Sequence, residues 1–144
     1  DTLLKILPLL YIKASMLSEC EVMGDDGLET FVTEDDYEVI RINIQELLAD
    51  RDDYLDVFVD DMKYSDTPIR KSIAEDLADI YQVTKDFVCQ FRSGLNGTMH
   101  DALAQCRDLF MEYWGQTLVN TMRALHEVKY CKSDEEEEDF LYND

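Results

Sequence analysis

The spacing of apolar residues along the chain predicts a protein built from helices. Apolar residues recur every three to four positions over four long stretches, the spacing of a helix that buries one face. In the first stretch Pro8 is expected to bend the helix rather than end it. The stretches cover residues 2–18, 34–49, 68–92 and 98–129. They predict an all-α, up-and-down bundle of four main helices.

Start and stop signals support this division. Thr33, with Asp36 three residues later, matches a capping box and opens the second helix. Thr67 is placed to cap the third helix, and Pro68 suits its first position. Gly94 follows the third helix, where a glycine commonly ends a helix. Because a short turn joins the third and fourth helices, we expect them to fold back as an antiparallel pair.

The segment 50–66 does not show helical spacing. Seven of its residues are aspartates, interleaved with apolar and aromatic residues. We expect an ordered acidic excursion that packs across one end of the bundle, with a short helical turn around 53–57. Residues 1–132 then form a single helical domain. Residues 133–144 hold seven acidic residues and no basic one, and a run of like charges predicts a flexible tail.

The net charge of -20 is unevenly distributed. Residues 19–66 hold 17 acidic residues against three basic ones, whereas residues 67–132 hold eight of each. No basic stripe exists to displace the counterions of a nucleic acid, so direct nucleic-acid binding is not expected. Anionic membrane surfaces would repel the chain for the same reason. The acidic surface instead favours a basic protein partner.

The cysteines and the hydropathy indicate a cytoplasmic protein. No two cysteines have the close spacing of a zinc or redox motif, and we expect all of them to be reduced and structural. No apolar run approaches the roughly 20 residues that a membrane span needs. The cysteines are Cys20, Cys89, Cys106 and Cys131.

Carboxylates on the third helix are the strongest candidates for chemistry. Asp76 and Asp79 lie one turn apart, and antiparallel pairing brings Glu112 of the fourth helix level with Asp79. Three carboxylates without a histidine suit a hard cation such as magnesium or manganese. The simpler interpretation is a solvated acidic face beside arginine and lysine partners. An EF-hand count from Asp50 fails, because its sixth position is not glycine.

Other catalytic patterns are absent from the sequence. His100 and His126 lie at opposite ends of the fourth helix and cannot share a site, and no glycine-rich phosphate loop occurs. Gly115, within a helix, needs a compensating reason. One interpretation is that it lets the third helix approach near Asp76, with Trp114 covering the flank. The alternative is a small-ligand pocket beside the indole.

Four runs of the sequence resemble an uncharacterised bacterial helical family, the domain of unknown function 5063. The runs are LLKILPLLYIKASML, FVTEDDYEVI, IAEDLADIYQVTKDFV and LFMEYWGQTLVNTMRALHEV. The resemblance spans about residues 3–128. It implies an all-helical fold, a bacterial cytoplasmic setting and one further helix before the point where this chain begins. It implies no cofactor, substrate or site residue.

The sequence therefore predicts a non-enzymatic interaction or accessory module that works through a helical face or its acidic segments. If a preceding helix is missing, open apolar faces of the first two helices would pair two copies in a symmetric homodimer. A metal-binding bundle, or a metal-dependent enzyme using Asp76, Asp79 and Glu112, is the alternative. A small-molecule sensor with a pocket near Trp114 is a weaker hypothesis.

Overall fold

The helices form where the apolar spacing places them. A computed structural model describes residues 1–56 and 69–131, and it confirms the all-α fold. Four helical regions are joined by loops, and the only sheet among the described residues has two short strands. The elements are α1 (Thr2–Ser15), α2 (Glu34–Leu48), the 3-10 turn η1 (Ala49–Arg51), β1 (Asp53–Leu55), β2 (Arg70–Ser72), α3 (Ile73–Phe91), α4 (Asn96–Leu109), the π-helical turn η3 (Phe110–Trp114) and α5 (Gly115–Tyr130).

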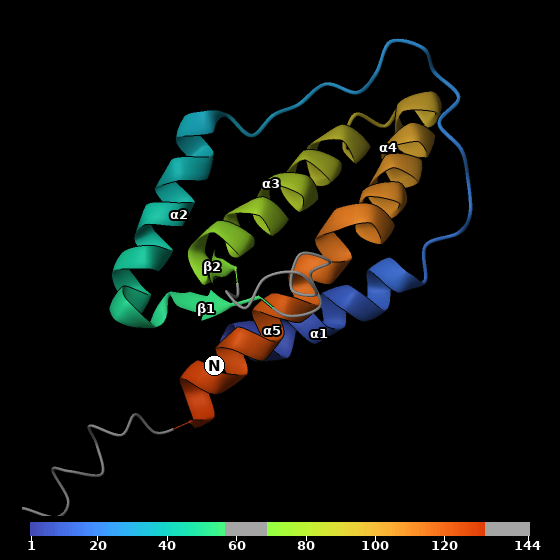
Figure 1. The fold of residues 1–144 in the computed structure, drawn as a ribbon. Helices are drawn as coiled ribbons and strands as arrows, with labels where there is room; N and C mark the ends of the chain where they lie inside the picture. The colour runs from blue at the N-terminus through green and yellow to red at the C-terminus, as the bar shows by residue number, and fades with distance from the viewer. Residues whose placement is uncertain (57–68, 132–144) are drawn as a thin grey trace, which may run out of the picture.

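Helix α3 lies at the centre of the bundle (Figure 1). Its main neighbours are α2 on one side and the continuous α4–η3–α5 region on the other, while α1 packs chiefly against α5. Gly94, in the left-handed region at φ 71°, makes the turn between α3 and α4, as predicted. The capping box of Thr33 and Asp36 opens α2, also as predicted. No helix of the described residues is long and apolar enough to cross a membrane.

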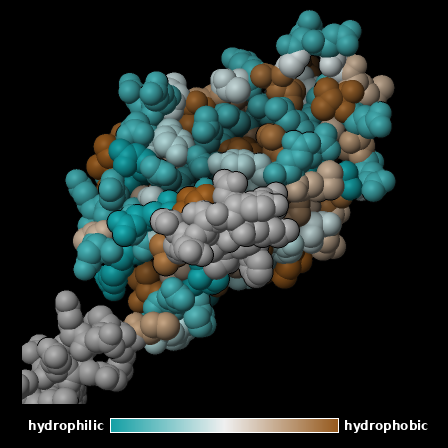
Figure 2. Space-filling view, viewed as in Figure 1, coloured by the Kyte–Doolittle hydropathy of each residue, from teal (hydrophilic) through white to brown (hydrophobic). Residues whose placement is uncertain are grey.

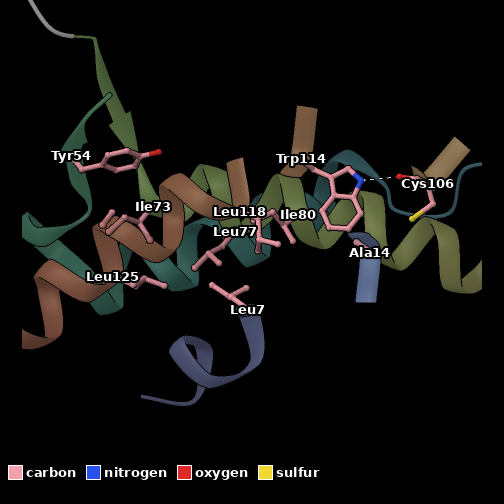
Figure 3. Close-up of a cluster of buried hydrophobic side chains, with 11 residues drawn as sticks. Leu7, Ala14, Tyr54, Ile73, Leu77, Ile80, Cys106, Trp114, Leu118 and Leu125 are labelled. Carbon is pink, nitrogen blue, oxygen red and sulfur yellow. Dashed lines mark hydrogen bonds between the residues drawn. The ribbon is translucent and has the colours of Figure 1, made fainter. Parts of the chain in front are cut away.

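The core lies between α3, α5 and α1 (Figure 3). Trp114 is 1% exposed and is the largest fully buried side chain among the described residues. Helix α2 contributes only half-buried residues, so it covers the core from outside rather than forming it. The buried apolar residues of the three core helices are Leu7, Ala14, Ile73, Ala74, Leu77, Ala78, Ile80, Leu118, Ala124 and Leu125.

Helix α1 leaves a large apolar surface exposed. Six large apolar side chains of α1 and of the residue that follows it are exposed, and the exposed fraction of Met16 is 71%. The homodimer predicted from open faces of the first two helices stays a prediction, because the structure describes one chain. The exposed side chains are Leu3, Ile6, Leu9, Tyr11, Ile12 and Met16.

The helical turn predicted around 53–57 is wrong. Asp53–Leu55 forms β1 and pairs antiparallel with β2, with Tyr54 opposite Lys71. Burial alternates along this segment: Asp52, Tyr54 and Asp56 are buried, whereas residues 51, 53 and 55 are exposed. A period of two is the pattern of a strand. Residues 57–68, which hold the rest of the acidic excursion, and the tail at 132–144 lie outside the described residues.

The predicted start of the third helix is also wrong. Thr67 and Pro68 lie outside the described residues, and the chain is still extended at Ser72, with φ -118° and ψ 127°. Ser72 is the true N-cap, and its hydroxyl accepts a hydrogen bond from the Glu75 N–H. The Ser72 hydroxyl also donates to Asp52, which accepts from the Ala74 N–H as well. The sequence Ser72-x-x-Glu75 was the overlooked helix-start signal.

Candidate functional site

The π-helical turn η3, in the α4–η3–α5 region opposite α3, explains why residue 115 is a glycine. The Gly115 N–H donates to the Phe110 carbonyl, five residues earlier. A Cβ at this position would lie 2.5 Å from that carbonyl oxygen and 3.0 Å from the Phe110 ring. The glycine is therefore required by Phe110, within its own helical region, and the predicted close approach of α3 is not the reason.

The same turn sets the position of the indole. Trp114 packs edge-on against Phe110, with ring centroids 4.8 Å apart. Its Nε1 donates to the Cys106 carbonyl over 3.2 Å (Figure 3). The indole thus serves the core as a buried, hydrogen-bonded side chain. The π turn leaves Tyr113 facing outward toward α3, where it joins the carboxylates described next.

Asp76 ties three elements together from the buried side of α3. Its Oδ2 accepts hydrogen bonds from the Tyr54 hydroxyl of β1 and, over 3.3 Å, from the Thr121 hydroxyl of α5. Burial raises the pKa of Asp76 to about 6, against the opposing effect of these two donors. Arg123 lies over the Tyr54 ring and donates to the Leu55 carbonyl at 2.6 Å.

Asp79, one turn further along α3, accepts hydrogen bonds from two tyrosines. Its Oδ1 accepts from the Tyr37 hydroxyl of α2 at 2.7 Å, and its Oδ2 from the Tyr113 hydroxyl at 2.5 Å. Burial, and then the hydrogen bond to Asp79, raise the pKa of both tyrosines above its usual value. Both hydroxyls therefore stay protonated and link α2 to the π turn through α3.

The predicted metal ligands are placed as follows. Glu112 was predicted to lie level with Asp79. Asp79 instead contacts the next residue, Tyr113, and Glu112 is exposed. The partners of Asp76 and Asp79 are hydroxyl groups, not the arginines or lysines expected for a solvated acidic face. Within residues 1–56 and 69–131, no group of three or more histidines, cysteines, aspartates and glutamates could hold a metal. The metal site of Asp76, Asp79 and Glu112 stays a prediction.

Two further carboxylates, which the sequence analysis missed, fasten the loop between α1 and α2. Asp86 on α3 accepts through Oδ1 from the N–H groups of Phe31 and Val32, at 2.7 and 2.8 Å. Asp101 on α4 accepts from the N–H groups of Met23 and Gly24, at 2.8 and 2.9 Å. The Met23 N–H, followed by the Gly24 N–H, holds the pKa of Asp101 below its usual value.

Other side chains of α3 and α4 complete this attachment. Gln90 donates to the Glu29 carbonyl at 2.9 Å, and a His100 ring nitrogen lies 2.8 Å from the Glu21 carbonyl. A Cβ on Gly24 would lie 2.8 Å from the Asp101 Oδ2, so any other residue there would make the Asp101 carboxylate shift. The loop is thereby attached at several points to the end of the bundle where α3 meets α4 (Figure 1).

These features define a helical domain whose buried carboxylates hold its segments together. The chain belongs to the family described as a domain of unknown function (DUF5063), whose model matches residues 1–131, and this confirms the predicted resemblance. It is also similar to a crystal structure of protein BF1032 from Bacteroides fragilis, solved as a structural genomics target. That likeness has 55% sequence identity and a TM-score of 0.80, and covers 93% of this chain and 77% of the other. No curated protein matches the chain.

Proposed function

We propose that this chain is a non-enzymatic, cytoplasmic interaction module that binds a basic protein partner through its loop between α1 and α2 and through α2. The observation that carries the proposal is the attachment of this acidic loop to α3 and α4. A free acidic loop would lose conformational entropy when it bound a partner. Here the ordering has already occurred on folding, through Asp86, Gln90 and Asp101.

Most acidic side chains of the loop between α1 and α2, of α2 and of the residues that follow it are exposed. Residues 19–56 hold 14 acidic residues and two basic ones, and eleven of the acidic side chains are exposed. Hydrophilic residues cover much of the face shown in Figure 2. The exposed acidic residues are Glu19, Glu21, Asp25, Asp26, Glu29, Glu34, Asp35, Asp36, Glu46, Asp50 and Asp53. Such a surface attracts basic partners and raises their rate of association.

The buried carboxylates and the half-buried Asp79 support a structural role rather than a catalytic one. A general base must reach the proton of a substrate, but Asp76 and Asp79 each accept hydrogen bonds from two side chains of the same fold. Asp86 and Asp101 accept from loop N–H groups. All four cysteines are free, as expected in a reducing compartment.

A pull-down with the immobilised protein from bacterial lysate, at low and at moderate salt, tests the proposal. We expect basic proteins to be retained at low salt and released at moderate salt, because exposed charges are screened. Asp25→Asn/Asp26→Asn should weaken the retention. Glu112→Gln/Glu127→Gln, which removes two exposed charges from the α4–η3–α5 region, should leave it nearly unchanged. Absence of any salt-sensitive partner would overturn the proposal.

A further inference from the structure

A cavity lies under the attached loop, between α3 and α4, and it has no role in the fold described so far. Its volume is about 200 Å³. Thr30 of the loop lines it, Val83, Phe87 and Leu109 supply apolar walls, and the polar lining comes from Asp86, Gln90, Gln82 and Gln105. Pockets for drug-sized ligands or cofactors begin at about 300 Å³, so this cavity suits a smaller group.

Asp86 and Gln90 are the buried polar residues of the wall, whereas Gln82 and Gln105 are exposed. The two buried residues offer two free acceptors and no free donor. The Asp86 Oδ1 and the Gln90 NH₂ group are used by the loop backbone. Within residues 1–56 and 69–131, the Asp86 Oδ2 and the Gln90 Oε1 have no hydrogen-bond partner, although neither is sealed from solvent. Both side chains are more than nine-tenths buried, at 9% and 7% exposure, and both line the cavity.

In the part of the chain that the structure describes, the charge of Asp86 also has no counterion. Among the described residues Asp86 forms no ion pair, and the ion pairs that do occur involve other carboxylates. A buried charge is usually paired or fully hydrogen-bonded, because removing it from water is costly. A cation that entered the cavity would supply the missing partner.

We infer that this cavity binds the side chain of a lysine from the basic partner. The inference rests on the proposed function, because it names the partner group that one part of the acidic surface takes. The ammonium has three donors and needs separate acceptors, which the Asp86 Oδ2 and the Gln90 Oε1 provide. The methylene stem packs on Val83 and Leu109, and the Phe87 ring adds a cation–π attraction.

Size and geometry favour lysine over arginine. At about 30 Å³ for each water-sized group, the cavity holds six or seven such groups, and a lysine side chain has five heavy atoms. The planar guanidinium of arginine is best bound by both oxygens of one carboxylate. Asp86 cannot offer both, because its Oδ1 already accepts from two loop N–H groups.

Titration calorimetry with hexalysine and with hexaarginine tests the inference, because the two peptides carry equal charge. The wild-type protein should bind hexalysine about tenfold more tightly, as one buried charge-assisted contact is worth 1.4 kcal/mol or more. Asp86→Asn keeps the carbonyl oxygen that the loop needs but turns an NH₂ group toward the cavity, so the preference should disappear. Glu46→Gln, an equal charge loss at an exposed site on α2, should preserve it.

A second variant tests whether the effect of Asp86→Asn comes from the cavity or from a disturbed loop. Val83→Phe enlarges a wall residue that forms none of the side-chain hydrogen bonds to the loop, and it should also abolish the preference. In this variant the methyl NMR shifts of Leu109 that hexalysine causes in the wild type should vanish. Equal binding of both peptides by the wild type, or a preference that survives in Asp86→Asn, overturns the inference and leaves the proposed function standing. Binding of neither peptide overturns both. Tighter binding of n-butylamine than of hexalysine assigns the cavity to free amines and also overturns it.

Discussion

Replacing Asp76 with asparagine should change how the stability of the protein depends on pH. Burial raises the pKa of this carboxyl from 3.8 to about 6 in the folded state. The folded protein therefore keeps the Asp76 proton over a pH range in which the unfolded chain has lost it. The stabilisation from this group is complete below about pH 4 and is lost as the pH rises through 6.

The magnitude follows from the size of the shift. Two pH units correspond to at most ~3 kcal/mol, and to ~1–2 kcal/mol after allowance for partial solvent access to the site. The Asp76→Asn side chain is neutral at every pH and retains an oxygen for the Tyr54 hydroxyl. Relative to the wild type, its free energy of unfolding should therefore rise by ~1–2 kcal/mol between about pH 4 and pH 7.

Urea denaturation followed by circular dichroism, over a pH series, measures this difference. Effects of the other carboxylates cancel in the comparison, because they are common to both proteins. Tyr54→Phe is a second variant for this experiment. It removes one hydrogen-bond donor to Asp76, so the pKa of Asp76 should rise further and the loss of stability should move to higher pH. A difference between Asp76→Asn and wild type that does not change with pH would refute the reasoning.

Three other perturbations test the fold and the carboxylates. Gly115→Ala should lower the melting temperature, at a cost of about 1–3 kcal/mol, because its Cβ meets the Phe110 carbonyl, whereas Gly97→Ala, in open space, should not. Ser72→Ala should lower the free energy of unfolding by about 1–2 kcal/mol through loss of the α3 cap, as measured by urea denaturation. Adding manganese or magnesium should leave the melting temperature unchanged, because Asp76 and Asp79 of α3 already accept hydrogen bonds from hydroxyl groups. A clear rise, with bound metal in elemental analysis, would instead support the metal-binding alternative.

Local sequence signals were enough to predict most helices and their ends. The capping box at Thr33 and the glycine at Gly94 act within a few residues, so their effects can be predicted without the fold. Strand β1 could not be predicted in this way, because three residues become a strand only by pairing with β2, which lies 15 residues further along the chain. The third helix was consequently predicted to start too early.

In the candidate site, too, only contacts with a local sequence signal could be predicted. Helical spacing predicted that Asp76 and Asp79 lie one turn apart, and antiparallel pairing placed Asp79 within one residue of its true partner, Tyr113. The loop attachments had no such signal. Asp86 and Phe31 are 55 residues apart, and the contact uses a backbone N–H that every residue except proline carries.

The central claim is that the attached acidic loop, with α2, binds a basic partner by charge. The most direct measurement is the affinity for hexalysine, determined by calorimetry over a series of salt concentrations for the wild type and for Asp25→Asn/Asp26→Asn. The account predicts affinity that falls steadily as salt rises and a weaker, less salt-dependent interaction for the variant. Affinity that is independent of salt, or equal in the two proteins at low salt, would contradict it.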